Sequence, residues 1–431
     1  MTSEDKRYTR LRCQVFLSAT VGYGIYYVCR LSLNVVKKPI VDSGTLTETE
    51  LGIIGSALFI TYAVGKFVNG FLADRVNVRR FMSLGLLAAA LVNLILGFSV
   101  PSGVFIALWA INGWVQSMGA PAGVVAQSRW IPDKQRGRFY GVWSASHNIG
   151  EALTFILVAA VVSAAGWQWG FRAAGLLGLA GAAMLALLLR DSPQSCGLPA
   201  PDAAQHAKEE EKSVWEHQKE VLRNPAIWML ALASAFMYIS RYAVNSWGVF
   251  YLEAQRDYTT LEASSIISIS SICGIIGTIV SGFVSDWFFK GSRNAPAVIF
   301  GVMNVIGLGL FLFGPATHVC MIISMVVFGL AIGALICYLG GLMAVDIASK
   351  KASGAALGVV GIASYVGAAL QDLVSGMTIQ AGKTEGVGYD FSVVSWFWLG
   401  AAILSVLFTL LVWTLSVRRK SLIIKVIRKS L

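Results

Sequence analysis

Charged residues are scarce in this sequence of 431 residues. Only 13% are Asp, Glu, Lys or Arg, whereas 56% are hydrophobic. A soluble chain of this length needs a larger share of charged side chains to cover its surface. The composition therefore excludes an ordinary soluble protein and predicts one that crosses a membrane several times.

Cysteine is also rare and shows no pattern of a chemical site. None of the six residues forms a CxxC pair, and most lie in apolar segments, where cysteine behaves as a small hydrophobic side chain. The sequence also lacks a nucleotide-binding loop and a catalytic constellation. We therefore expect no metal, no cofactor and no enzymatic activity. The cysteines are Cys13, Cys29, Cys196, Cys273, Cys320 and Cys337.

Acidic residues are outnumbered by basic ones, which gives a formal net charge of +11. The basic residues lie mainly in short loops between apolar segments, where cytoplasmic loops of membrane proteins carry them. The charge therefore needs no nucleic-acid partner to explain it, and we expect none. The partner that the composition does require is a lipid bilayer.

Long apolar segments are abundant. A membrane-spanning helix needs about 20 such residues, and the sequence supplies twelve segments of suitable length. The expected spans are 12–38, 51–73, 81–99, 103–129, 139–164, 168–190, 225–252, 261–284, 295–315, 318–345, 353–380 and 391–416.

The distribution of basic residues predicts the orientation of these spans. Loops after even-numbered spans are rich in Lys and Arg, and both ends of the chain are basic, so both termini are expected on the cytoplasmic side. Lys37 and Lys38 are among the few basic residues expected toward the opposite side. We predict a six-helix half at 1–190, a polar cytoplasmic loop at 191–224 and a second six-helix half at 225–431. A bacterial inner membrane is the expected location.

A triplet of tyrosine, arginine and asparagine occurs in the first span and again in the seventh, shifted by 211 positions (238 − 27). The spacing of i, i+3 and i+7 places each triplet on one face of its helix. An arginine inside a membrane span is energetically unfavourable and usually faces a cavity or a partner. The triplets are Tyr27, Arg30 and Asn34, and Tyr238, Arg241 and Asn245.

Two arginines suggest what the triplets bind. A guanidinium stays charged at physiological pH and offers a planar fork of donors that fits phosphate or carboxylate oxygens. Two facing forks predict a site for a dianion, to which the tyrosines add hydroxyl donors while the asparagines bind hydroxyls or brace the arginines. In the alternative interpretation, the Arg30 side chain extends toward the outer surface instead.

His147 and Glu151 are a second polar feature, in the fifth span. They are four residues apart and share a helix face. A protonated His147 would add charge to an anion site, and the pair would link substrate binding to proton occupancy. Hydrogen bonds between helices remain the alternative interpretation for both residues.

A turn motif also repeats, with a shift of 212 positions (282 − 70). Gly70, Asp74 and Arg75 lie at the end of the second span, and Gly282 and Asp286 lie at the end of the eighth. This motif resembles that of the major facilitator superfamily, where it serves a gating turn. The resemblance implies an all-α membrane fold with twelve helices in two pseudo-symmetric halves and a substrate site where the halves meet.

Four longer stretches carry a closer resemblance. GYGIYYVCR ending at Arg30, SHNIG around His147, LRDSPQSCGLP from Leu189, and RYAVNSWGVFYL beginning at Arg241 are similar to the organophosphate:phosphate antiporter family. That family includes glycerol-3-phosphate and hexose-phosphate transporters, a hexose-phosphate sensor and the microsomal glucose-6-phosphate translocase. The resemblance implies exchange of an organic phosphate for inorganic phosphate, with Arg30 and Arg241 at the phosphate and His147 as the fifth-span histidine.

Two departures from the family pattern keep alternatives open. Leu31 stands where many members have a lysine, and Gly354–Gly361 lacks the acid and lysine of hexose-phosphate carriers. One alternative is a membrane sensor that binds a sugar phosphate and signals to a membrane partner. The other is a proton-coupled symporter of organic anions that uses Glu151 and His147.

Overall fold

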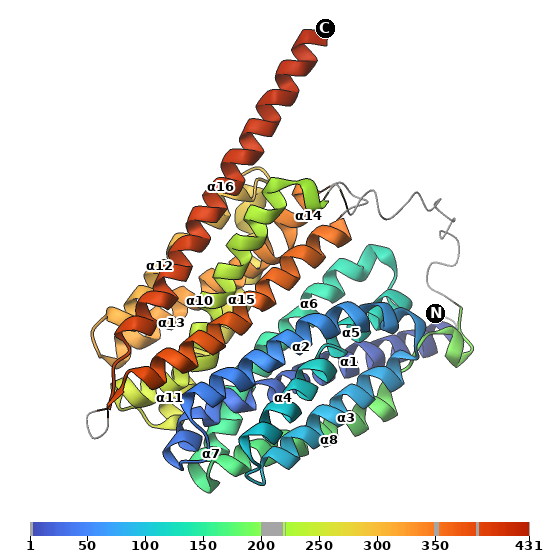
Figure 1. Ribbon diagram of the computed structural model, residues 1–431. Coiled ribbons are helices and arrows are strands. Elements are labelled where there is room, and N and C mark those ends of the chain that lie inside the picture. The colour runs from blue at the N-terminus through green and yellow to red at the C-terminus, as the bar shows by residue number, and fades with distance from the viewer. Residues whose placement is uncertain (1–2, 200–218, 220, 349–352, 385–387, 431) are drawn as a thin grey trace. The chain divides into compact units, whose positions relative to one another are not determined.

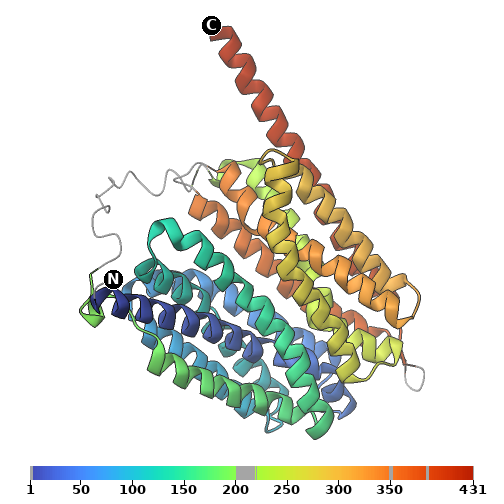
Figure 2. The ribbon, with the colours of Figure 1, turned by 180° about the vertical axis from the view of Figure 1, so that it is seen from behind.

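The computed structural model describes residues 3–199, 219, 221–348, 353–384 and 388–430, which are almost entirely helical (Figures 1 and 2). Most of the expected central loop, at 200–218 and 220, lies outside the described residues. The chain divides into two compact units. The first is Met1–Glu209 with Ser246–Ser268, and the second is Glu210–Asn245 with Ile269–Leu431. The expected domain boundaries stay a prediction.

The first unit contains the helices of the N-terminal part of the chain. In order they are α1 (Ser3–Asp42), α2 (Glu48–Arg75), α3 (Val78–Leu96), α4 (Ser102–Gln116), α5 (Gly119–Trp130), α6 (Asp133–Leu153), the π-helical turn η1 (Thr154–Val158), α7 (Ala159–Ala165), α8 (Trp167–Leu188) and the short 3₁₀ turn η2 (Gln194–Cys196). Within this unit α3 packs along α8, α2 along α4, and α1 against both α8 and α6.

The second unit holds most of the remaining helices and a two-stranded hairpin. They are α10 (Pro225–Arg256), α11 (Thr260–Phe283), the π-helical turn η3 (Val284–Phe288), α12 (Asn294–Phe313), α13 (His318–Cys337), the π-helical turn η4 (Tyr338–Leu342), α14 (Met343–Ile347), α15 (Ser353–Ala381), β1 (Lys383–Thr384), β2 (Gly388–Tyr389) and α16 (Ser392–Ser430). The hairpin is antiparallel, with Lys383 opposite Tyr389. The C-terminal part of α10 and the start of α11 belong to the first unit.

Ten helices in the described part of the chain are long and apolar enough to span a membrane, and each matches one expected span. The two exceptions are α1, which carries Arg30 and two lysines, and the expected span 103–129. The latter is broken into α4 and α5 at Ser117, whose carbonyl lies four residues before Pro121. A proline lacks the N–H for that carbonyl and clashes with it, which explains the break.

The outward faces of the helices are apolar, as a bilayer requires. Large hydrophobic side chains are exposed along most helices, including Phe67, Phe71, Trp287, Phe288 and Trp396. On a protein in water, this much exposed apolar surface would promote association. The expected all-α membrane fold is confirmed.

The internal repeat is also visible in how helices begin. Before α2 the Thr47 N–H donates to the Glu50 carboxylate (2.8 Å), and the Glu50 N–H donates to the Thr47 hydroxyl (3.3 Å). Thr259 and Glu262 make the same reciprocal pair before α11, at 3.0 and 3.4 Å. Each pair satisfies two backbone groups that a helix start leaves unpaired. The shift is again 212 positions (259 − 47).

Glycines allow close contacts between helices in each unit. A Cβ added to Gly150 of α6 would lie 2.2 Å from the Gly24 carbonyl oxygen of α1. In the second unit, a Cβ added to Gly367 of α15 would lie 2.5 Å from the Ala235 carbonyl oxygen of α10. Only a residue without a side chain allows such an approach. The helices that carry the two arginines are therefore each in close contact with one partner helix.

Candidate functional site

Arg30 lies in an aromatic cage in the first unit. Its side chain is buried, with 3% exposure. The guanidinium carbon lies 4.3 Å from the centre of the Tyr62 ring, 5.5 Å from that of Tyr27 and 5.7 Å from that of Phe59. A cation over aromatic faces is stabilised by the ring quadrupole, most strongly where water is excluded. Arg30 is therefore held inside the protein, whereas a side chain that reached for the outer surface would be exposed.

The cage is built by two helices. Tyr27 precedes Arg30 by one turn on α1, and Phe59 and Tyr62 are three residues apart on one face of α2. Asn34 lies one turn beyond Arg30 and is also buried, with 8% exposure. The face that the sequence predicted on α1 is therefore a buried polar face.

His147 lies beside this cage. Its ring centre is 5.5 Å from that of Tyr27, and its Nδ1 contacts the Ser144 carbonyl oxygen. Because a carbonyl only accepts, Nδ1 carries the hydrogen, and Nε2 of the neutral ring is left as an acceptor. Glu151, one turn further along α6, is buried with 5% exposure. The structure thus brings Tyr27, Arg30 and His147 together.

The second unit contains a similar arrangement around Arg241. This arginine has 8% exposure, and its guanidinium carbon lies 5.3 Å from the centre of the Tyr242 ring and 5.7 Å from that of Tyr238. The Tyr238 ring in turn meets Tyr365 of α15 edge to face, with ring centres 5.6 Å apart. Asn245, one turn beyond Arg241, is buried with 6% exposure. The predicted triplet therefore also forms a buried polar face on α10.

The structure adds residues that the sequence analysis did not single out. In the first unit these are Phe59 and Tyr62 of the cage, together with Lys37, which is completely buried. In the second unit Asp372 is buried with 2% exposure. It lies seven residues after Tyr365 and so on the same face of α15. Lys37 and Asp372 are charged residues inside long helices. A charge in such a position indicates a buried polar site, so the sequence could have pointed to both residues.

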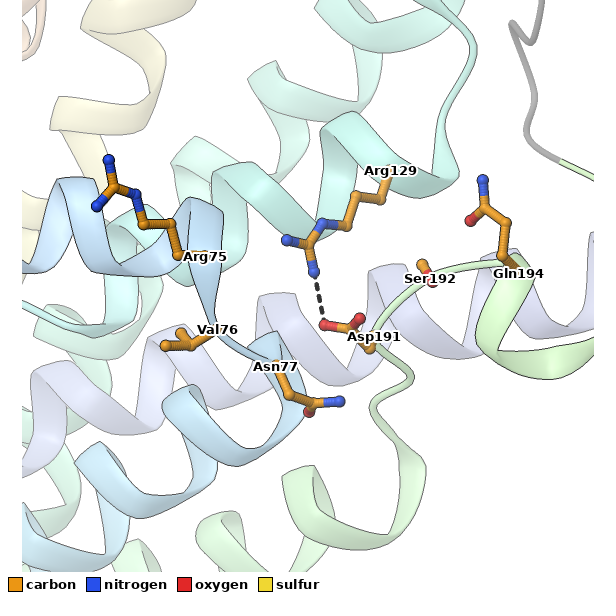
Figure 3. A pocket seen from close by; sticks show the side chains of 7 residues that line it. All are labelled: Arg75, Val76, Asn77, Arg129, Asp191, Ser192 and Gln194. Atoms are coloured by element: carbon orange, nitrogen blue, oxygen red, sulfur yellow. Dashed lines mark hydrogen bonds and ion pairs between the residues drawn. The ribbon is translucent and has the colours of Figure 1, made fainter.

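The first turn motif lies at one end of the first unit. Asp191, after α8, accepts hydrogen bonds from the Arg129 guanidinium (2.6 Å) and the Val78 N–H (2.7 Å). Arg129 also donates to the backbone oxygen of Asp74 (3.0 Å). In Figure 3 the Arg129 side chain points to Asp191, whereas Arg75 points away from that pair. These contacts join α2, α3, α5 and the segment after α8.

A cavity of about 490 Å³ lies beside these contacts (Figure 3). It is lined by Arg75, Val76, Asn77, Arg129, Asp191, Ser192 and Gln194. The second turn motif lies in the other unit, where Asp286 is part of η3 and is exposed. Near it Arg293 forms an ion pair with Asp346 of α14. A gating role for Asp74, Arg75 and Asp286 stays a prediction.

Comparisons with known proteins match most of the length of the chain. A model of the Major Facilitator Superfamily matches residues 19–371. The membrane sensor protein UhpC of Salmonella typhimurium is 34% identical over 377 residues, covering 85% of each chain. A probable hexose phosphate transport protein of Chlamydia trachomatis is 32% identical over 415 residues, covering 87% of this chain and 86% of the other.

The glycerol-3-phosphate transporter of Bacillus subtilis is also 32% identical, over 428 residues that cover 95% of this chain and 94% of the other. Among solved structures, a bacterial homolog of the human lysosomal transporter Spinster matches with a TM-score of 0.76. It covers 93% of this chain and 95% of its own, at 17% identity. At that identity the match concerns the fold alone.

Proposed function

The chain belongs to the Major Facilitator Superfamily and, within it, to the organophosphate:phosphate antiporter family, and we propose that it exchanges an organic phosphate ester for inorganic phosphate across a membrane. Membership of this transporter family confirms the expectation that the chain is not an enzyme. The relatives that carry hexose phosphate and glycerol 3-phosphate support a phosphate ester as the substrate.

One observation carries the proposal: each unit holds a buried arginine within a repeated Tyr-Arg-Asn triplet. Each guanidinium is charged at any physiological pH, and its planar fork of N–H donors matches the oxygen atoms of a phosphate. We assign the phosphoryl group to Arg30 and Arg241. Tyr27 and Tyr238 supply further donors, and His147 supplies one when its second ring nitrogen is also protonated. Asn34 and Asn245 bind hydroxyls of the ester or brace the arginines.

Exchange follows from charge. Without an anion, two cations brought toward one another repel, so the empty carrier resists the movement that would close the site. A bound dianion removes that repulsion and lowers the barrier to alternating access. Either phosphate or a phosphate ester satisfies this condition, so each crosses only in return for another such anion, phosphate or ester.

The test uses the purified protein in proteoliposomes loaded with inorganic phosphate. We expect labelled phosphate outside to exchange with phosphate inside, and vesicles without internal phosphate to take up little. A panel of competing three-carbon and six-carbon phosphate esters then identifies the substrate. Absence of exchange from protein that binds a phosphate ester saturably would contradict the proposal.

A sensor is the second candidate function, because the relative at 34% identity is a membrane sensor protein and Gly354–Gly361 lacks the acid and lysine of hexose-phosphate carriers. Such a receptor would bind the ester, transport little and signal to a membrane partner. The proteoliposome measurement separates the two functions, since a sensor binds without exchange.

Proton coupling through His147 and Glu151 is the third arrangement to test. Glu151 is buried one turn from His147, which supports a site whose charge depends on pH. If a pH gradient drives uptake into vesicles that contain no phosphate, the protein is a symporter. Uptake that needs internal phosphate at every pH supports the exchanger.

The chain is a multi-pass membrane protein, and its bacterial relatives support a place in a bacterial inner membrane. We propose that both termini are cytoplasmic and that the halves 1–190 and 225–431, which the loop 191–224 connects in sequence, move against one another.

A further inference from the structure

A buried asparagine of α3 contacts α1 on both sides of Arg30. The Asn93 amide donates to the Cys29 carbonyl oxygen at 2.9 Å, and its own oxygen accepts from the Ser32 hydroxyl at 2.7 Å. Cys29 directly precedes Arg30, and Ser32 follows it by two residues. The three partners are fully buried. The turn of α1 that carries the arginine is therefore bound to α3 at two points in the interior of the first unit.

The Asn93 side chain is held in one orientation. Its nitrogen also donates to the Ala89 carbonyl oxygen at 2.9 Å, so both N–H groups and the oxygen of the amide have partners. A second buried amide, that of Asn112 on α4, donates to the same Cys29 carbonyl at 3.1 Å. A polar network whose members are satisfied stiffens the groups that it joins, most of all where water is excluded. The backbone directly before Arg30 is therefore held in place.

The second unit contains a similar contact beside Arg241. Asn304 of α12 donates to the Ser240 hydroxyl at 3.0 Å, and Ser240 directly precedes Arg241. The Ser240 hydroxyl donates in turn to the Met237 carbonyl oxygen at 2.9 Å. Asn304 and Ser240 are fully buried. Here α12 holds α10 directly before the arginine.

Both contacts follow the internal repeat. The shift from Asn93 to Asn304 is 211 positions (304 − 93), and the shift from Cys29 to Ser240 is also 211 (240 − 29). The two Tyr-Arg-Asn triplets are related by the same shift. The asparagines therefore belong to the same repeated unit as the triplets, and each binds the residue before its arginine.

An arginine that binds a phosphate needs such support. Its guanidinium lies at the end of a long side chain, and the planar fork matches phosphate oxygens only in certain orientations. A functional group stays within about 0.5 Å of its productive position only when surrounding packing and hydrogen bonds hold it. The aromatic rings beside Arg30 and Arg241 lie against the guanidinium, whereas the asparagines hold the backbone from which each side chain starts.

We propose that Asn93 and Asn304 are positioning residues of the phosphate site, and that each fixes the helix turn from which Arg30 or Arg241 reaches the anion. The inference rests on the proposed function, because it takes the two arginines as phosphate ligands. The asparagines act through the arginines and do not contact the substrate. Asn93 holds its turn on both sides of the arginine, so its effect is larger than that of Asn304.

The first experiment measures how tightly the purified protein binds inorganic phosphate, which needs no transport. Asn93→Leu keeps the approximate size of the side chain and removes its hydrogen bonds. We expect it to raise the dissociation constant about tenfold, the lower end of the loss seen when outer partners of metal ligands are removed. Asn304→Leu should raise the constant about threefold, since it removes one neutral hydrogen bond. In proteoliposomes both variants should raise KM for phosphate more than they lower kcat.

Asn69→Leu is the matched control. Asn69 is another buried asparagine of the first unit, and its amide donates to the Ser117 hydroxyl at 2.7 Å and to the Trp114 carbonyl oxygen at 3.3 Å. It joins α2 to the end of α4. Its loss should lower the thermal stability as Asn93→Leu does and leave the affinity for phosphate unchanged. Equal losses of phosphate affinity in the two variants would overturn the inference.

A double variant shows whether Asn93 acts through Arg30. Arg30→Lys keeps the charge without the planar fork, so the orientation of its helix turn matters less. In that background, Asn93→Leu should weaken phosphate binding by about twofold or less, whereas independent effects would multiply. Effects that multiply in full would also overturn the inference.

Hydrogen exchange in lipid nanodiscs reports the two helix turns directly. Backbone amides of 29–34 should exchange faster in Asn93→Leu, and those of 240–245 faster in Asn304→Leu, because each turn has lost a contact that opposes local opening. Asn69→Leu should change neither segment. Unchanged exchange in both segments would overturn the inference.

Ser32→Ala covers the case in which Asn93→Leu does not fold. It removes one of the bonds that Asn93 makes to α1, and it should change phosphate affinity and hydrogen exchange in the same direction by less. A native chain that binds no phosphate would overturn the proposed function, whereas the hydrogen exchange would still show whether the asparagines hold the arginine turns.

Discussion

In the first unit α1 packs against α6, and in the second α10 packs against α15 in the same manner. A tyrosine that precedes the arginine meets one ring on the partner helix: Tyr27 meets His147 at 5.5 Å, and Tyr238 meets Tyr365 at 5.6 Å. A glycine on each partner helix lies against the arginine helix close to that ring. The backbone arrangement is thus repeated.

The chemistry on this repeated scaffold differs. His147, which can change charge near neutral pH, corresponds to Tyr365, which is uncharged there. The Arg30 guanidinium carbon lies 4.3 Å from the centre of the Tyr62 ring, whereas that of Arg241 lies 5.3 Å from the centre of the Tyr242 ring. Packing depends on small residues and ring contacts that duplicated halves retain, while side-chain charge is free to diverge. The two arginines, to which we assign a shared role, therefore lie in different surroundings.

The strongest test of the shared role is to remove each charge. We expect Arg30→Gln and Arg241→Gln each to lower phosphate exchange by about a hundredfold or more, because truncating one partner of a buried charge pair costs about 2–5 kcal/mol. Initial rates in proteoliposomes measure this. Arg30→Lys and Arg241→Lys keep the charge without the planar fork and should retain intermediate activity. Near-normal exchange by either glutamine variant would remove that arginine from the site.

The aromatic surroundings give the second test. Tyr62→Leu should weaken binding of the phosphate ester by up to about thirtyfold, since a desolvated cation–π contact contributes about 2 kcal/mol. Tyr242→Leu should weaken it less, because its ring is farther from Arg241. The KM for exchange measures both. Tyr62→Phe keeps the ring and should stay close to the native protein, so a large defect there would point to the hydroxyl instead.

The sequence predicted the parts of this site that stand out against an apolar background. Arg30, Arg241 and His147 are polar residues in hydrophobic segments, and the internal repeat identified the two arginines. Phe59 and Tyr62 were not predictable from the sequence. An aromatic residue in a membrane helix gives the same sequence pattern whether its ring faces a cation or a lipid. The cage exists only once α1 and α2 are packed.

Two other shortfalls have physical causes. The expectation for Lys37 concerned only its side of the membrane and stays a prediction. Its burial was not predicted, since a position near the end of a span does not show which way the side chain turns. The span 103–129 was expected as one helix, although Pro121 breaks it. For comparison, the two cap threonines were within reach of sequence rules, because a capping box is a local pattern.

The buried acid Asp372 provides a test of substrate selectivity in the second unit. Its buried carboxylate lies on the same face of α15 as Tyr365, which contacts Tyr238 beside Arg241. A second negative group on the substrate would be repelled by about 1 kcal/mol at 10 Å or more. Asp372→Asn should therefore improve competition by phosphate esters that carry a carboxylate roughly fivefold, relative to esters that carry only hydroxyls.

The competition panel against labelled phosphate measures this shift. Asp390→Asn removes an exposed acid from the loop before α16 and is the matched control, with no expected change in selectivity. An equal loss of affinity for all esters in Asp372→Asn would indicate a structural role for the carboxylate in place of selectivity.

The smallest expected effect concerns the repeated helix caps before α2 and α11, which do not contact the proposed site. Thr47→Ala and Thr259→Ala each remove a capping hydroxyl with the same geometry, so each should lower stability by about 1 kcal/mol. Thermal denaturation in detergent measures the loss, and serine at either position, which keeps the hydroxyl, should restore it. Phosphate exchange per folded molecule should be unchanged in both variants.

The two caps are alike, whereas the surroundings of the two arginines differ. Equal losses of stability at Thr47 and Thr259, together with unequal effects on KM at Tyr62 and Tyr242, would show that the halves have diverged at the site and not in their scaffold. Unequal losses at the caps would mean that the divergence extends to the helix starts as well.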